Sequence, residues 1–561
     1  MIAHRGPISG IAAYQDAYVL TAGYDNQIIL WEMASKEPLT RTWHDHLANQ
    51  VAFSPDGRLA VTSSSDYSAR LWALPELRLV AVLAEQTDDV EMSAFHPHRE
   101  LIATASRDHN VRVYDFKGSL VVTFTGHTAD VISVEWSRDG DEIISSSDDG
   151  TIKRWSMSSR RLVADLDMEG VETDTVAIST DGTIYAGNDN GQIIVVTDDG
   201  RTTIDAHEAG IKRVVLDHRR ALLVTLSYDR TMKLWDVRDA EPVITTTTDL
   251  PADVWPRSCA FAGDSQLVFA TFGATYRIYD YRSGKWVDED VPPTPGVNAV
   301  LADAASRVIT VGDAGIVKRD GETIAETGSL CNFLVAVGDR VLTGGQLGKL
   351  FDATTGAVVH QHRSPLNCGV AFTHDNRPHV LIGAYTGEGL VFELGDQGLR
   401  FVTELRLHGN AVKGVAESDG RLFSVAADAS ATWCDGNTLE VLRTVQDGHT
   451  KIANGCVGLG QGYFASISRD LRLRIWDPQF TPAVIETPHD HSIKCVSASS
   501  DGRQVATGGY HGRVCVYDRQ ADSWVVNQRP TTAGISSLSY APGLGCFLAS
   551  SYDGNVYRVD A

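Results

Sequence analysis

Histidines and acidic residues occur together at two places where they could bind a metal ion. His44-Asp45-His46 and His489-Asp490-His491 each offer two imidazoles and a carboxylate, a donor set that suits Zn²⁺. The first histidine of each group, however, lies twelve residues before the aspartate of a turn (Asp56 and Asp501). His127 precedes Asp139 by the same distance and has no neighbouring histidine. The shared spacing favours a structural role, and we predict no metal site.

Pairs of acidic residues could support acid–base catalysis or Ca²⁺ binding. Each pair lies at or near a predicted turn, where aspartate is preferred because it hydrogen-bonds the local backbone. The chain has neither the phosphate-binding pattern G-x-x-x-x-G-K-[ST] nor the nucleophile pattern G-x-S-x-G. We therefore predict no catalytic residues, no cofactor and no enzymatic activity. The pairs are Asp88-Asp89, Asp148-Asp149 and Asp198-Asp199.

Residues 127–155 show which elements hold these side chains. The segment reads HTADVISVEWSRDGDEIISSSDDGTIKRW, and Val131–Trp136 and Glu142–Ser146 alternate as half-buried strands do. Asp139-Gly140 and Asp149-Gly150 separate the runs, and Asp-Gly suits a tight hairpin because glycine accepts a positive φ. The segment predicts three short antiparallel strands, and the apolar run Leu162–Leu166 adds a fourth.

One spacing within this segment recurs along the chain. Asp149 lies four residues after Ser145 and six before Trp155. Asp108 stands in the same relation to Thr104 and Tyr114. Four further segments repeat the pattern, and a histidine precedes each of them. The further sets are Thr21, Asp25 and Trp31 after His4; Thr62, Asp66 and Trp72 after His44; Thr225, Asp229 and Trp235 after His207; and Ser466, Asp470 and Trp476 after His449.

These residues resemble the repeats of the WD40 family, and the resemblance covers essentially the whole chain. The family forms β-propellers from four-stranded blades, so the resemblance implies an all-β fold. It also implies that the histidine, hydroxyl residue, aspartate and tryptophan of one repeat form a buried hydrogen-bonded set, as for His127, Ser145, Asp149 and Trp155. Fourteen repeats can be traced, which is about 40 residues for each in a chain of 561. Because single propellers carry four to eight blades, we expect two seven-bladed propellers in tandem.

The strand count predicts how the two rings close. The last repeat stops after its third strand near Tyr557, and Ile2–His4 is a spare fragment that could pair with it. Because an open edge is a liability, we expect both chain ends to share this blade. The first propeller would then comprise residues 1–248 with 531–561, and the second residues 249–530. The alternative is a division into 1–290 and 296–561, separated at Pro292–Pro295.

The residue before each turn aspartate is a candidate for binding a partner. In WD40 proteins this turn lies on the top face with the partner-binding loops, and tyrosine and arginine carry much of the binding energy at interfaces. Shared closure would bring Tyr228, Tyr552 and Tyr24 onto consecutive blades, with Arg107 two blades further round. We predict this as the main partner-binding face. The second choice is the pair of turns at Arg469 and Tyr510.

Composition limits the classes of function. The formal charge of −23 and the pI of about 5.1 oppose non-specific nucleic-acid binding. No run of about 20 apolar residues is present, and the first residues lack the apolar core of a signal peptide. The eight cysteines form no C-x-x-C pair, which suits free thiols in a reducing compartment. We expect a cytoplasmic protein that binds neither nucleic acid nor membrane.

Two functional hypotheses remain open. The first is a non-catalytic scaffold that binds protein partners on its propeller top faces, as a sensing or regulatory subunit of a larger assembly. The alternative is a ligand-binding or hydrolase- or lyase-type propeller that uses a central channel. The predicted first strands offer Glu135 and Lys212 to such a channel but no repeated catalytic set.

Overall fold

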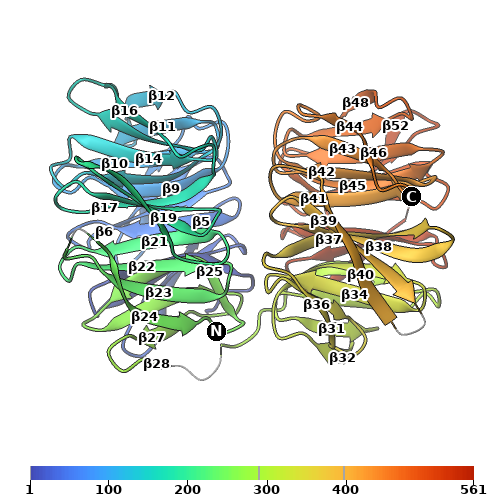
Figure 1. Cartoon of the computed structure of the whole chain (residues 1–561), viewed down its shortest axis with the longest axis horizontal. Helices are drawn as coiled ribbons and strands as arrows, with labels where there is room; N and C mark the ends of the chain where they lie inside the picture. The colour runs from blue at the N-terminus through green and yellow to red at the C-terminus, as the bar shows by residue number, and fades with distance from the viewer. Residues whose placement is uncertain (1, 240, 288–290, 396–397, 561) are drawn as a thin grey trace. The chain divides into compact units, whose positions relative to one another are not determined.

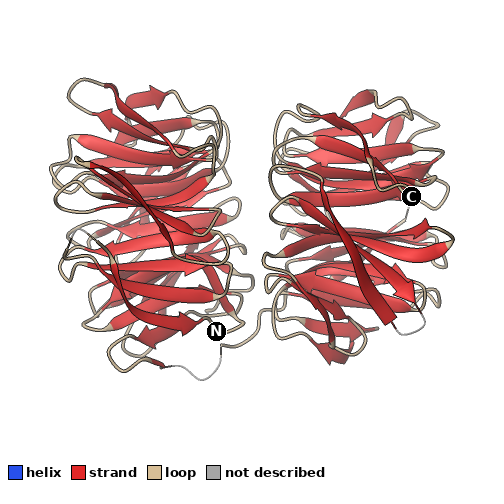
Figure 2. Cartoon of the chain, viewed as in Figure 1, coloured by secondary structure: helices blue, strands red, loops and turns tan. Residues whose placement is uncertain are grey.

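The computed structural model describes residues 2–239, 241–287, 291–395 and 398–560. All the regular secondary structure of these residues is β-strand (Figure 2). They form fourteen antiparallel sheets, thirteen of four strands and one of three. Each sheet is called a blade and numbered in chain order. The chain divides into two compact units, Met1–Thr294 (unit one) and Pro295–Ala561 (unit two). The predicted all-β, propeller-type fold is confirmed.

Unit one holds blades one to seven, each of four consecutive strands (Figure 1). Its strands are β1 Ile8–Tyr14, β2 Tyr18–Gly23, β3 Gln27–Glu32, β4 Pro38–Trp43; β5 Ala48–Phe53, β6 Leu59–Ser64, β7 Ala69–Ala73, β8 Arg78–Leu83; β9 Val90–Phe95, β10 Leu101–Ser106, β11 Asn110–Asp115, β12 Leu120–Thr125; β13 Val131–Trp136, β14 Glu142–Ser147, β15 Thr151–Ser156, β16 Arg161–Asp167; β17 Thr173–Ile178, β18 Ile184–Asn188, β19 Gln192–Thr197, β20 Gly200–Asp205; β21 Ile211–Asp217, β22 Leu222–Ser227, β23 Thr231–Asp236, β24 Val243–Asp249; β25 Val254–Ala262, β26 Gln266–Thr271, β27 Arg277–Asp280 and β28 Lys285–Trp286.

Unit two holds blades eight to fourteen, of which only the last has three strands. Its strands are β29 Val297–Ala302, β30 Val308–Gly312, β31 Ile316–Arg319, β32 Glu322–Glu326; β33 Cys331–Val337, β34 Arg340–Gly345, β35 Lys349–Asp352, β36 Val358–Gln361; β37 Leu366–His374, β38 Arg377–Ala384, β39 Glu388–Gly395, β40 Gly398–Arg406; β41 Val412–Ser418, β42 Arg421–Ala426, β43 Ala431–Asp435, β44 Val441–Val445; β45 Ala453–Gly460, β46 Tyr463–Ser468, β47 Arg472–Trp476, β48 Pro482–Glu486; β49 Ile493–Ala498, β50 Gln504–Gly509, β51 Val514–Asp518, β52 Ser523–Gln528; β53 Ile535–Ala541, β54 Cys546–Ser551 and β55 Val556–Val559.

Blade four shows how the sequence produces these sheets. Gly140 and Gly150 adopt φ of +76° and +73° in the two turns, a conformation that residues with a Cβ atom rarely adopt. The turns bring Val134 opposite Ser145 and Ser145 opposite Lys153 in antiparallel register. Alternate residues then point toward the two neighbouring blades, which bury both faces of the sheet.

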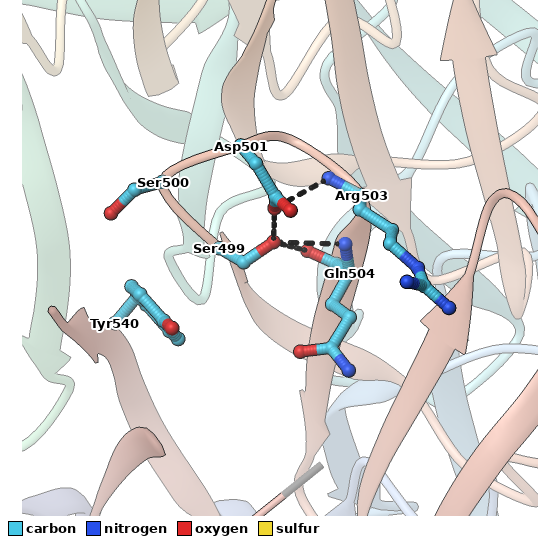
Figure 3. Close-up of a pocket in the computed structure, with 6 residues that line it drawn as sticks. All are labelled: Ser499, Ser500, Asp501, Arg503, Gln504 and Tyr540. Carbon is cyan, nitrogen blue, oxygen red and sulfur yellow. Dashed lines mark hydrogen bonds between the residues drawn. The ribbon is translucent and has the colours of Figure 1, made fainter. Parts of the chain in front are cut away.

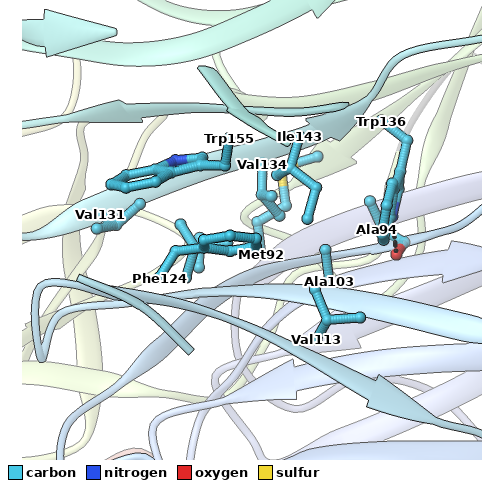
Figure 4. Packing of buried hydrophobic residues seen from close by; sticks show 12 residues of the cluster. Met92, Ala94, Ala103, Val113, Phe124, Val131, Val134, Trp136, Ile143 and Trp155 are labelled. Carbon is cyan, nitrogen blue, oxygen red and sulfur yellow. Dashed lines mark hydrogen bonds between the residues drawn. The ribbon is translucent and has the colours of Figure 1, made fainter. Parts of the chain in front are cut away.

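The apolar core lies between blades rather than inside one sheet. Figure 4 shows the cluster between blades three and four, where Phe124, Trp155 and Met92 pack together. The rings of Phe124 and Trp155 lie 5.4 Å apart between centroids. Trp136 Nε1 donates to the carbonyl oxygen of Ala94 at 3.0 Å, which ties the two blades together. Each blade is therefore stable only with a neighbour on both sides, and a ring must close.

Unit one closes through blades one and seven. The inner strands form one circuit in which β1 packs beside β5 and β25 packs beside both β21 and β1. Ile11 N donates to Ser258 Oγ at 3.1 Å across this junction. Ile2 packs against the cluster that contains Tyr276, and His4 N donates to Ala274 O at 3.0 Å. The first residues of the chain therefore lie against blade seven.

Unit two closes through blades eight and fourteen. β53 packs beside both β49 and β29, which completes the circuit of seven inner strands. Ser536 Oγ donates to Val297 O across the junction. The chain passes between the units at Thr294–Pro295, inside the proline-rich segment that the alternative division used.

The predicted shared blade is therefore wrong. Ile2–His4 does not pair with the strand that holds Tyr557, and residues 531–561 belong to unit two instead of completing residues 1–248. Residues 249–294 complete unit one instead of starting the second ring. The physical reason lies in blade seven, where the fourth strand β28 has only two residues and the carbonyl group of Ala274 remains available to the N-terminal segment.

Candidate functional site

The histidine-centred set of blade four is a chain of buried hydrogen bonds. His127 lies 2.8 Å from Asp149 through Nδ1 and 2.8 Å from Ser145 Oγ through Nε2. Trp155 Nε1 donates to the same Oγ at 2.9 Å. These bonds, together with Thr128 N, hold the pKa of Asp149 well below its usual range even though burial acts in the opposite direction. The set fixes the turn to the two strands beside it.

Three other blades of unit one contain the same arrangement. Histidine Nε2 contacts the hydroxyl group at 2.6–2.8 Å, Nδ1 contacts the aspartate at 2.8–3.0 Å, and the tryptophan donates to the hydroxyl group. The sets are His4, Thr21, Asp25 and Trp31; His44, Thr62, Asp66 and Trp72; and His207, Thr225, Asp229 and Trp235. The first histidines of the two candidate metal groups, His44 and His489, both make hydrogen bonds of this structural kind. His489 Nε2 contacts Thr507 Oγ1 at 2.9 Å.

Blade twelve modifies the set with an arginine. His449 Nε2 lies 2.8 Å from Ser466 Oγ, and Trp476 Nε1 donates to the same hydroxyl group at 2.8 Å. Arg474, however, lies between the histidine and Asp470, at 2.9 Å from His449 Nδ1 and 2.8 Å from the carboxylate. Burial and the adjacent guanidinium lower the pKa of His449 to about 3.

Every inner strand begins with a β-bulge, a feature that the sequence analysis missed. The register shifts by one residue near the start of thirteen inner strands and by more in β25. A bulge inserts one extra residue into the strand, and the side chain of this residue does not follow the regular alternation. In unit two, four of the seven bulge residues are asparagines, Asn298, Asn332, Asn367 and Asn454.

The bulge asparagines join consecutive blades. Asn454 Nδ2 donates to the carbonyl oxygen of Ile493, the first residue of the next inner strand, at 2.7 Å. Asn332 makes the equivalent bond to Leu366 at 3.1 Å. We call these bonds interblade clamps. Their sequence signal is an asparagine that directly follows the first residue of an inner strand. The others run from Asn49 to Val90, Asn298 to Cys331 and Asn367 to Val412, with Ser9 and Ser536 in the same role.

In unit one, charged bulge residues replace most of the clamps and form a network. We call the mouth of unit one the end of its ring of inner strands where the bulge residues meet the residues before the turn aspartates. Glu91 of blade three pairs with Arg107 of its own blade and, at 3.0 Å, with Arg257 of blade seven. Blades three and seven are not neighbours in the ring, so this bond crosses the ring. Lys212 pairs with Asp174 and Asp189.

Carboxylates outnumber cations at this mouth. Five acidic side chains interact there with three cationic ones, and Glu172 adds a sixth carboxylate next to Asp148. Asp148 shows the consequence, because burial and the carboxylates of Glu172 and Asp130 raise its pKa well above the usual range against the opposing effect of Arg107. A cation that entered beside Asp148 would relieve this repulsion. The acidic residues are Glu91, Asp130, Asp148, Glu172, Asp174 and Asp189, and the cations are Arg107, Lys212 and Arg257.

An aromatic group lines the opposite side of the mouth. The ring of Tyr24 meets that of Trp255 edge-on at 5.2 Å, and Lys212 Nζ lies 5.3 Å from the ring of Tyr228. Blades six, seven and one therefore contribute Tyr228, Trp255 and Tyr24 in sequence. The expected grouping with Tyr552 is wrong because blade fourteen lies in unit two. Trp255 was missed because the longer bulge of β25 places it without a turn-aspartate signal.

The second predicted group falls on one unit. Arg469, Tyr510 and Tyr552 occupy the equivalent turn positions of blades twelve, thirteen and fourteen, each with its N–H donated to the loop before the inner strand of its own blade. The rings of Tyr510 and Tyr552 are stacked at 6.4 Å with an interplanar angle of 12°. Unit two thus carries a smaller aromatic face of its own.

The two residues considered for channel chemistry are separated. Lys212 belongs to the mouth, whereas Glu135 lies beside Arg213 on the inner strands. Burial raises the pKa of Glu135 to about 7, and Arg213 acts in the opposite direction. Among the described residues, no group of three or more histidine, cysteine or acidic side chains is placed to hold a metal ion.

A pocket of about 330 Å³ lies at the first turn of blade thirteen (Figure 3). Ser499, Asp501 and Tyr540 contribute to its lining. Ser499 Oγ donates to Asp501 at 2.5 Å and accepts from Gln504 N at 2.9 Å. The polar atoms therefore stabilise the turn itself. In the described part of the chain, no helix has the length and apolar character needed to cross a membrane.

Comparison with known families agrees with this geometry. Five segments match the model of the WD domain, G-beta repeat: residues 37–73, 77–115, 118–156, 198–236 and 482–518. Each segment starts in or just before the fourth strand of one blade and ends with the third strand of the next. These five segments are WD40 repeats, and the resemblance predicted from the chain's histidines, aspartates and tryptophans is confirmed.

Several curated WD-repeat relatives are subunits of assemblies. The chain is 28% identical to transcription initiation factor TFIID subunit 5 of Caenorhabditis elegans over 34% of this chain and 30% of that protein. It is 25% identical to the target of rapamycin complex subunit wat1 of Schizosaccharomyces pombe, over 39% and 74%. It is 22% identical to the transcriptional corepressor LEUNIG_HOMOLOG of Arabidopsis thaliana, over 40% and 34%. The chain spans about a third of the first and last of these proteins.

These relatives bear on the predicted class and localisation. Their names describe subunits and a corepressor, not enzymes, which supports an interaction scaffold in general terms. The predicted cytoplasmic localisation is contradicted, because relatives are named for transcription initiation and corepression, which are nuclear processes in animals and plants. The composition of the sequence carries no signal that separates nucleus from cytoplasm. The expected absence of a nucleic-acid partner stays a prediction.

Proposed function

We propose that the protein is a non-catalytic scaffold subunit whose main partner-binding face is the mouth of unit one. The observation that carries the proposal is the crowding of carboxylates around Asp148, whose pKa is raised by burial and by Glu172 and Asp130. Such repulsion costs stability in the free protein and is relieved by a cation. The mouth therefore favours a partner that presents a lysine or arginine side chain.

The aromatic residues give this face its second property. Tyr24 and Tyr228 are half-buried, so part of the surface of each residue remains exposed to solvent, and Tyr24 lies against Trp255. Tyrosine supplies a large rigid surface with a polar tip and loses little entropy on binding. We expect the partner to place a basic side chain among the carboxylates. The apolar residues that flank this side chain in the partner would then pack against the tyrosines. The face formed by Arg469, Tyr510 and Tyr552 is the second candidate surface.

The experiment is an affinity purification with a matched pair of variants. Asp148→Asn replaces a buried carboxyl group whose pKa is already raised by burial and by Glu172 and Asp130, so it should leave the fold intact or slightly stabilise it. Combined with Tyr24→Ala, it should lower affinity for the stoichiometric partner by more than tenfold, because central hot-spot truncations cost about 2 kcal/mol. Asp139→Asn, in the other turn of blade four, is the control. Unchanged partner affinity in the folded double variant would rule out this face.

A further inference from the structure

The mouth of unit two is defined in the same way as that of unit one, by the bulge residues and the residues before the turns after the second strands. Each of the seven blades contributes one residue of each kind. The bulge residues are Asn298, Asn332, Asn367, Lys413, Asn454, Lys494 and Ser536. The residues before the turns, whose N–H groups bond the loop ahead of the inner strand, are Asp313, Gln346, Tyr385, Ala427, Arg469, Tyr510 and Tyr552.

These positions carry an excess of positive charge, although the chain as a whole has a formal charge of −23. Lys413, Arg469 and Lys494 are cationic, and Asp313 is the only acidic residue among the positions named above. Asp313 is buried in blade eight, where Asn298 Nδ2 donates to its carboxylate at 2.9 Å. The mouth of unit one has the opposite balance, with carboxylates in excess. The two mouths therefore suit partners of opposite charge.

The cations of unit two lie on three consecutive blades. Lys413 belongs to blade eleven, Arg469 to blade twelve and Lys494 to blade thirteen, and the inner strands of these blades pack side by side. Lys451 adds a fourth cation in the loop before β45, where its carbonyl oxygen accepts a bond from Ser468 Oγ at 3.0 Å. All four cationic residues are half-buried. A partly desolvated cation attracts an anion more strongly than a cation in bulk water does.

Tyrosines continue this face on both sides of the cations. Lys413 Nζ lies 5.0 Å from the centre of the ring of Tyr385 on blade ten, a cation–π contact that holds the lysine at the mouth. On blades thirteen and fourteen the rings of Tyr510 and Tyr552 are stacked. All three tyrosines are half-buried, so each keeps some surface exposed to solvent. The face therefore combines positive charge with aromatic surface.

A carboxylate in the loop before β49 has cationic neighbours of its own. Asp490 lies 3.2 Å from Arg513 Nη2 and 3.5 Å from His511 Nδ1. Its charge is balanced within blade thirteen, so it does not reverse the sign of the charge at this mouth.

We infer that the mouth of unit two binds an acidic peptide, with carboxylate side chains against Lys413, Arg469 and Lys494 and apolar side chains against the tyrosines. The cations are spread over three blades, so they suit several carboxylates along a segment. A single phosphate group would instead need several donors at one point. A nucleic acid would bring many more negative charges to a chain that is itself strongly acidic. This surface is separate from the main partner-binding face proposed above, and its test does not depend on that face.

The test measures how tightly a labelled peptide, EELDEFEE, binds the full chain. A second peptide, QQLNQFQQ, keeps the size and the apolar residues but lacks the carboxylates. The acidic peptide should bind at least tenfold more tightly, because several ion pairs contribute together. Its affinity should fall as salt is added, because salt screens these pairs. Equal affinity of the two peptides would overturn the proposal.

Substitutions locate the binding face. The triple variant K413Q, R469Q and K494Q should lower affinity for the acidic peptide at least tenfold. The matched control, R406Q, R443Q and R529Q, removes the same charge from exposed arginines in or just after fourth strands and should bind as the natural chain does. K494Q alone should lower the affinity by about threefold, and it replaces the triple variant if that variant does not fold.

Three results would contradict the inference. The first is an equal loss of affinity in the two triple variants, which would show that only the overall charge of the chain matters. The second is tighter binding of a peptide whose only charge is one phosphoserine, which would mean that the cations converge on a single group. The third is tighter binding of single-stranded DNA than of the acidic peptide, which would make the partner a nucleic acid.

Discussion

At the scale of single residues, the turn aspartates connect the chemistry of the sequence to the stability of the blade. Asp149 accepts bonds from His127, from Thr128 N and from Thr151. The carboxylate is nearly inaccessible, with 5% of its side-chain surface exposed. Because His127 is also buried, it has no water to replace the carboxylate if Asp149 is removed.

Asp149→Ala should destabilise unit one by about 1–3 kcal/mol, the cost of leaving buried donors unpaired. Asp139→Ala is the matched control, since Asp139 lies in the exposed turn of the same blade and bonds Ser137 and Asp141 N. Chemical denaturation followed by hydrogen exchange in unit one measures both. Equal stability of the two variants would show that the buried set does not stabilise the blade.

Three buried histidines predict a pH dependence for unit two. Burial lowers the pKa of His408 and His489 to about 4 and that of His449 to about 3. Unfolded histidine titrates near 6.5, so below this pH the unfolded state takes up protons that the folded state does not. Stability is therefore complete above about pH 6.5 and falls toward pH 4.

At pH 5 the loss should be about 1–2 kcal/mol for each histidine. Thermal unfolding, read by hydrogen exchange in unit two at pH 7 and pH 5, checks this. His489→Gln, which cannot titrate, should reduce the slope between these pH values. A slope unaffected by the substitution, or a unit two that is more stable at pH 5, would contradict the assignment.

At the scale of elements, the bulge at the start of each inner strand determines what the two channel mouths contain. In unit two it presents asparagines that clamp one blade to the next, and in unit one it presents Glu91, Asp174 and Lys212. The same backbone feature thus presents mostly asparagines, with Lys413 and Lys494, in unit two and a network of paired acidic and basic side chains in unit one. A partner would distinguish the two faces by these side chains, not by the fold.

Asn454→Ala should destabilise unit two by about 1 kcal/mol, because the carbonyl group of Ile493 loses its donor. Asn437→Ala is the control, since Asn437 is exposed in a turn of the same unit. Denaturation curves of both variants give the comparison. A clamp variant as stable as the control would mean that packing alone holds blades twelve and thirteen together.

Strands and turns were predictable from the sequence because their signals are local. Asp149 with Gly150 defines a hairpin, and Trp155 follows at a fixed spacing, so the blade can be read within thirty residues. Closure was not predictable in this way. It depends on contacts such as Ile11 with Ser258, and blade seven has no turn aspartate to mark its role. The predicted site was incomplete for the same reason, because it included Tyr24 and Tyr228 but not Trp255.

At the scale of the molecule, each half of the chain forms its own ring of seven blades. This arrangement is what places Tyr24, Trp255 and Tyr228 on consecutive blades of one mouth. The proposed binding face therefore depends on where the rings close.

Expression of residues 1–294 alone is the most direct test of this account. Because the inner strands of this fragment form a complete circuit, it should unfold in one cooperative transition. Its amide protection at β1 and β25 should equal that of the full chain, and residues 295–561 should behave likewise. An unfolded fragment 1–294 that becomes structured only when residues 531–561 are added would show that the two chain ends share a blade, and would contradict the account.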